Sequence, residues 1–139
     1  MLELELIAPV LALIAWTFVM WAWMYATRIP AMRAANIDFD ELARTGAPLQ
    51  LPAKVSRVAD NYNHLHEQPT LFYALALAAQ LSGAVDGMSV VLAWAYVALR
   101  VVHSLVQATK NVIVVRFSVF AVASVVLFAL LVRTITLLV

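Results

Sequence analysis

The chain contains no cysteine, and this absence removes several kinds of chemistry at once. Disulfide bonds, thiolate zinc sites and a nucleophilic protein thiol are all excluded. Any sulfur chemistry must therefore come from a ligand. Glycine is scarce, with 3 residues in 139, and only 12% of residues are charged, whereas an ordinary soluble domain is about 25% charged.

The composition is dominated by apolar residues: 65% of the chain is hydrophobic and the mean hydropathy is +0.92. Because about 20 apolar residues cross the core of a bilayer, we predict an all-α integral membrane protein. The expected architecture is one domain, residues 1–139, forming a four-helix transmembrane bundle with spans at about 7–26, 54–81, 88–107 and 112–138. A cleaved signal peptide at 7–26 is disfavoured, since acidic residues precede an overlong apolar run.

The connections between these spans differ in length and character. Residues 28–52 form a polar, mobile interfacial loop, in which Asp38 and Glu41 predict one short capped helix. The first half of the second span is so polar that it must face protein or water. Pro69 cannot donate a hydrogen bond to the carbonyl of Leu65, which predicts a kink there. Short turns at 82–87 and 110–111 predict antiparallel neighbours.

Basic residues gather on one side of the predicted topology. That side carries Arg28, Arg33, Arg44, Lys54, Arg57, Lys110 and Arg116, and the other carries Arg133 with Glu3, Glu5 and Asp86. The positive-inside rule then places both termini on the non-cytoplasmic side. The short loops favour a bacterial inner membrane. Membrane lipids are expected partners, and no nucleic acid is.

A polar stripe inside the third span is the leading candidate for a binding site. Arg100, His103, Ser104 and Gln107 follow the spacing i, i+3, i+4, i+7, which puts them on one face of a helix. An arginine among apolar residues at membrane depth costs several kcal/mol unless an anion or water meets it. The stripe therefore predicts an anion-binding site.

Two neighbouring spans carry polar residues that can reach the same depth. Asp60, His64 and Glu67 are spaced i, i+4, i+7 in the second span, with Arg57 nearby, and Arg116 opens the fourth. We expect these side chains to line one cytoplasm-facing chamber. Its excess of positive charge favours an anionic ligand, and an arginine beside a ligand thiol would lower the pKa of that thiol.

Each candidate also has a structural alternative. Arg116 and Lys110 could extend to the interface, and Arg100 could pair with Glu67 or Asp60. His103 could be a neutral core histidine, Tyr96 a packing residue, and Ser104 bonded to its own helix. A metal is a competing ligand, because His64, Glu67 and His103 could form a set of two histidines and one carboxylate. We expect no metal.

The sequence resembles the MAPEG proteins, the membrane-associated proteins of eicosanoid and glutathione metabolism. The resemblance covers roughly residues 55–130. It rests on four spans in about 140 residues, the run NHLHEQPTLF at 63–72, the Arg-x-x-His of the third span and the arginine that opens the fourth.

The resemblance implies a homotrimer that holds glutathione between subunits near the cytoplasmic surface. It assigns glutathione contacts to Arg57, His64, Glu67, Arg100, His103, Gln107 and Arg116, with Arg100 and Arg116 as the catalytic residues that activate the thiol. The implied function is a glutathione-dependent transferase or peroxidase that acts on a lipophilic electrophile. The alternative is a non-catalytic membrane protein that binds a lipid headgroup or organic anion. Gln107 and Phe120 stand where some relatives have tyrosines, which favours that alternative.

Overall fold

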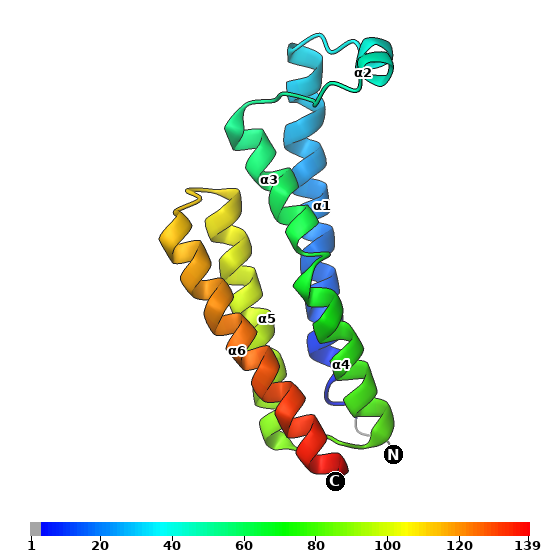
Figure 1. Ribbon diagram of the computed structural model, residues 1–139, viewed down its shortest axis with the longest axis vertical. Coiled ribbons are helices and arrows are strands. Elements are labelled where there is room, and N and C mark those ends of the chain that lie inside the picture. Colours follow the sequence, from blue (N-terminus) through cyan, green and yellow to red (C-terminus); the bar gives the residue numbers. More distant parts are fainter. Residues whose placement is uncertain (1–3) are drawn as a thin grey trace.

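The computed structural model describes residues 4–139, so Glu3 of the charge count lies outside the described residues. It is all helical over that range, which confirms the predicted class. Figure 1 shows the beginning of α1 and the end of α6 at the same end of an elongated molecule. The helices are α1 (Ile7–Ala34), α2 (Phe39–Thr45), α3 (Ala53–His64), α4 (Gln68–Ser82), α5 (Gly87–Ala108) and α6 (Ile113–Leu138).

Three of these helices, α1, α5 and α6, are long and apolar enough to cross a membrane. α5 and α6 coincide within a residue with the predicted third and fourth spans. α1 is 28 residues long and continues past the predicted end at 26, with Pro30 inside it. The apolar run marks where hydrocarbon ends. A helix can continue beyond that point into water, so hydropathy underestimates its length.

The predicted second span is two helices rather than one. α3 ends at His64 and α4 begins at Gln68, with Leu65–Glu67 between them. Pro69 stands in the first turn of α4, where its missing N–H costs nothing. The kink expected at Pro69 is thus a complete break. Figure 1 shows α3 and α4 following one another alongside α1, and a fourth membrane crossing by this pair stays a prediction.

Capping residues fix the ends of the short helix α2 and of the connection between α4 and α5. Asp38 accepts a hydrogen bond from the amide of Glu41 at 3.1 Å and so caps α2, as its spacing predicts. α4 ends at Gly83, whose φ of +73° suits glycine. Asp86 then caps α5 by accepting from the amide of Ser89 at 2.9 Å. These two caps shape the connection between α4 and α5, but α4 packs mainly on α1 and α6, so the antiparallel packing predicted from the turn at 82–87 is not observed.

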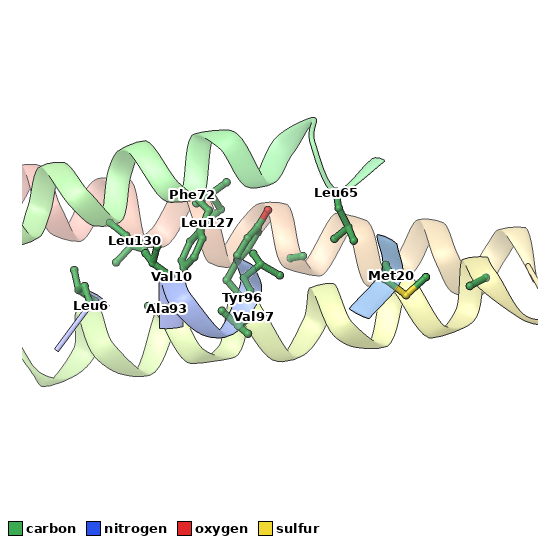
Figure 2. Close-up of a cluster of buried hydrophobic side chains, with 14 of the residues drawn as sticks. Leu6, Val10, Met20, Leu65, Phe72, Ala93, Tyr96, Val97, Leu127 and Leu130 are labelled. Atoms are coloured by element: carbon green, nitrogen blue, oxygen red, sulfur yellow. The ribbon is translucent and has the colours of Figure 1, made fainter. Parts of the chain in front are cut away.

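The core lies where α5 meets its neighbours. α5 and α6 form an antiparallel hairpin, and α5 also packs on α1 and α3. Figure 2 shows Phe72, Tyr96 and Leu127 brought together from α4, α5 and α6, with Tyr96 stacked on Phe72 at 4.8 Å. At the end of the hairpin near the C-terminus, Arg133 of α6 forms an ion pair with Asp86. The site described next lies toward the opposite end.

Candidate anion-binding site

The polar stripe of α5 faces the interior of the protein, as its spacing predicts. Arg100 is 0% exposed, Ser104 is 0% and His103 is 2%, and Gln107 is also buried. These residues turn toward α3 and α6, while residues on the other side of α5, such as Val102 and Leu105, are exposed. The helix therefore carries a guanidinium group into the centre of an apolar bundle.

Arg100 reaches α3 through His64. One guanidinium nitrogen, Nη2, lies 2.7 Å from Nδ1 of His64. A guanidinium group has no acceptor atoms, so it donates and Nδ1 must carry the lone pair. His64 is therefore neutral, with its proton on Nε2. This contact neutralises none of the charge of Arg100.

Three helices meet around the two histidines. The rings of His64 and His103 stack with centroids 4.7 Å apart and planes 17° apart. Phe120 of α6 presents its ring to His64 at 5.5 Å and 70°. The stack holds His64 in place against Arg100. The predicted convergence of His64, Arg100 and His103 is observed.

The interior stripe contains many polar atoms without a hydrogen-bond partner. Atoms of this kind cost about 1–3 kcal/mol each when buried, and native proteins contain few of them. Their gathering along one helix face indicates that a ligand or water supplies the missing partners. On α5 the atoms are Nε and Nη1 of Arg100, Nδ1 of His103, Oγ of Ser104 and Oε1 of Gln107, and both amide atoms of Asn61 on α3 are unpaired as well.

Two more arginines lie at the α5–α6 turn. Arg57 of α3 donates to the carbonyl oxygen of Thr109 at 3.1 Å, and Arg116 of α6 donates to Oδ1 of Asn111 at 2.8 Å. Asn111 adopts a left-handed conformation with φ of +50°, which asparagine tolerates better than most residues. Neither arginine forms an ion pair with a described residue. Both cations are half-buried at the open end of the stripe.

Neither acidic residue predicted in the second span is buried. Asp60 and Glu67 are exposed, and the polar α3 residues that are buried or half-buried near α5 are Arg57, Asn61 and His64. The predicted spacing counted through Glu67 as if the helix were continuous. The break at Leu65–Glu67 takes Glu67 out of that helical frame. Within α3, Asn61 is buried where Asp60 was predicted, while Arg57 and His64 lie on the predicted face.

The internal pairing of Arg100 with Glu67 or Asp60, considered from the sequence, is not formed. Within residues 4–139 the ion pair between Arg133 and Asp86 is the only one, so no carboxylate lies within 4 Å of Arg100. The predicted metal alternative is not assembled either, because the described residues contain no group of three His, Asp or Glu side chains that could hold an ion.

Asn61 is the residue that the sequence prediction missed. Arg57 contacts Thr109 and His64 contacts Arg100, so Asn61 lies at the level of α5 between those two contacts, near Ser104. The sequence could have indicated this, because Asn61 lies four residues after Arg57 and three before His64, on the helix face that they share.

A chain of hydrogen bonds lies next to the site, on its side nearer the chain termini. The hydroxyl of Tyr96 donates to Oε1 of Gln68 at 3.2 Å, and Nε2 of Gln68 donates to Oγ of Ser124 at 2.8 Å. Tyr96 therefore does more than pack: it connects α5 through the first turn of α4 to α6. This connection ties the start of α4 to Tyr96, which lies one helical turn from Arg100.

The fold and the site together define a class of protein: a helical membrane protein with an uncompensated guanidinium group in its interior. The comparisons with known proteins agree with that class, since residues 6–136 match the MAPEG family. The chain belongs to the MAPEG family, whose members are generally associated with glutathione. No curated protein and no solved structure matches the chain.

Proposed function

We propose that this protein is a membrane-embedded glutathione transferase or peroxidase that acts on a lipophilic electrophile arriving from the bilayer. The observation that carries the proposal is Arg100: its guanidinium group is fully buried, two of its nitrogens have no partner, and no described carboxylate compensates its charge. A buried charge of this kind calls for an anionic ligand.

The shape of the unpaired set suits a tripeptide. From Arg100 to Gln107 the stripe extends about 10 Å at a rise of about 1.5 Å per residue. It offers a cationic donor at one end and amide and hydroxyl groups from Asn61, Ser104 and Gln107 beyond it. Carboxylates can bind the guanidinium groups and peptide amides can pair with the neutral groups. Glu67, being exposed at the helix break, contributes from the rim.

The chemistry follows from placing a cation near a thiol. Glutathione supplies the thiol that this chain lacks. The guanidinium group of Arg116 or Arg100 favours the thiolate over the thiol, which raises the fraction of the nucleophilic form at neutral pH. Arg116 suits this role because its single described hydrogen bond is to a neutral amide at the mouth of the stripe.

We expect that His64 must move before a ligand reaches Arg100, and that a second copy of the chain completes the site. Arg100 is covered in the single chain, whereas His64 is half-buried, so rotation of His64 would open the stripe. The MAPEG resemblance supports a homotrimer in which neighbouring subunits wall the ligand near the cytoplasmic surface. In this arrangement both termini lie on the non-cytoplasmic side of a bacterial inner membrane.

Thermal unfolding with and without millimolar glutathione tests binding, since a ligand of the folded state alone raises the melting temperature. Conjugation of glutathione to chlorodinitrobenzene tests catalysis. We expect a rise in melting temperature and measurable conjugation by the detergent-purified protein. Replacing Arg116 by alanine should abolish conjugation and leave the oligomer intact. Arg44→Ala, on exposed α2, is the matched control that retains activity.

The outcomes separate the two functions. Normal turnover by Arg116→Ala would remove Arg116 from the mechanism. Stabilisation by glutathione with no conjugation of any electrophile would leave the non-catalytic binding protein. No stabilisation at saturating glutathione would overturn the proposal altogether.

A further inference from the structure

A second pocket lies beside the helix break, on the α1 side of the molecule. It has a volume of about 180 Å³. We call it the break pocket. It is lined by Thr17, Phe18 and Trp21 of α1 and by Tyr62, His66 and Thr70 on either side of the break.

The break in the helix determines which ring nitrogen of His66 carries the proton. Because the amide of His66 donates to Asn63, the carbonyl of Tyr62 is left without its usual helical partner. Nδ1 of His66 lies 2.8 Å from that carbonyl oxygen. A carbonyl only accepts, so Nδ1 carries the proton. In the neutral ring the lone pair is then on Nε2, and no described residue bonds to it. The ring is further held against Tyr62 at 4.7 Å.

Two threonine hydroxyl groups of the pocket already donate to backbone carbonyls. Thr17 donates to the carbonyl of Leu13 at 2.9 Å, and Thr70 donates to that of Glu67 at 2.7 Å. Their oxygens, like Nε2 of His66, can therefore only accept from a guest. The indole N–H of Trp21 and the hydroxyl groups of Tyr62 and Tyr73 line the same pocket and can donate. A guest that both donates and accepts a hydrogen bond is complementary to this set.

The walls and the size restrict the guest further. Aromatic rings from Phe18, Trp21, Tyr62 and Tyr73 surround the space. A cavity of about 150 Å³ accommodates benzene, so the break pocket accommodates one ring with small substituents. Phe18 and Trp21 are exposed and leave the pocket open to the side. Trp21 and Tyr25, stacked edge to face, mark the depth of the headgroups, where amphipathic rings gather.

We propose that the break pocket binds a single-ring phenol, whose O–H donates to Nε2 of His66 while its ring lies among the aromatic side chains. The phenolic oxygen can accept from Trp21 at the same time. The break pocket shares no residue with the anion-binding site, and binding of a phenol there does not depend on glutathione. Methylation of the hydroxyl group should weaken binding, because it removes the proton that His66 requires.

Fluorine NMR of the full chain in nanodiscs, without glutathione, tests this with 4-fluorophenol and 4-fluoroanisole as probes. Empty nanodiscs give the concentration of each probe in lipid. Relative to that concentration, we expect the phenol to bind roughly fivefold more tightly, the value of one net hydrogen bond. His66→Phe retains an aromatic ring but has no acceptor, so it should bind both probes equally. Ile14→Trp, at a partly exposed position in the pocket wall, should exclude both.

Equal binding of the two probes by the unmodified protein would overturn the proposal. So would a preference for the phenol that survives in His66→Phe, since the proton would then be accepted elsewhere. If His66→Phe does not fold, the comparison of the two probes on the unmodified chain and the loss of binding in Ile14→Trp still decide the question.

Discussion

The α5–α6 hairpin carries arginines toward both of its ends, and the two ends treat them in opposite ways. Near the C-terminus, Arg133 is paired with Asp86, which also caps α5. In the other half, Arg100 donates to a neutral histidine and Arg116 to a neutral amide. At the paired end, the charge of Arg133 is neutralised by a residue of the same chain. At the unpaired end no described carboxylate neutralises the charge, as the proposed anion-binding site requires.

The strongest way to break the comparison is to replace Arg100 by methionine. We expect glutathione to lose its stabilising effect and conjugation to fall by at least about 100-fold, as for loss of one electrostatic contact at a reacting centre. The ligand-free protein should unfold at a higher temperature, because an apolar side chain of similar length replaces an uncompensated buried charge. Thermal unfolding and conjugation assays measure both effects.

Arg100→Lys is the control, since it retains the charge but loses the planar fork. Arg100→Lys should have little of the conjugation activity of the unmodified protein and none of the thermal stability that Arg100→Met gains. A ligand-free Arg100→Met protein that is less stable than the unmodified one would show that Arg100 is structural and that the two ends of the hairpin do not differ as described.

Tyr96→Phe tests the hydrogen-bond chain beneath the site. It removes the hydroxyl that donates to Gln68 and retains the ring stacked on Phe72. We expect a loss of about 1 kcal/mol in the free energy of unfolding, measured by chemical denaturation in detergent. The rise in melting temperature with glutathione should remain. Loss of that rise would place Tyr96 in the binding site itself.

The smallest effect is expected at the paired end, where it depends on pH. The hydrogen bond from Arg133, aided by that from the Ser89 amide, lowers the pKa of Asp86 below its usual value. A lowered pKa stabilises the folded state fully above the unfolded pKa of about 3.9, and this contribution is lost as the pH falls through the folded value. Asp86→Asn should therefore melt slightly lower than the unmodified protein at pH 7.

The difference in melting temperature between Asp86→Asn and the unmodified protein should narrow as the pH falls from 5 toward 3, roughly the range in which a free carboxyl becomes protonated. A difference that stays constant over this range would mean that the ion pair contributes nothing to stability. Glutathione binding at pH 7 should be unaffected by the substitution.

Periodicity predicted the parts of the fold that depend on local sequence. The α5 stripe was correctly placed on one buried face because an uninterrupted helix obeys a fixed angular spacing. The cap at Asp38 was also correct, since capping involves residues three apart. The prediction for Glu67 counted the same spacing across a break, and because α3 ends at His64, Glu67 lies outside that helix and is exposed.

By itself the amino-acid sequence determined an all-helical membrane protein without a thiol of its own, and an arginine on the inner face of α5. Composition and helical spacing are sufficient for these features because they depend on neighbours along the chain. Only the tertiary structure decided that Arg100 meets His64 rather than a carboxylate, and that Asn61 joins it. Partners across helices depend on where each helix begins and ends, and a shift of one residue turns a side chain by about 100°.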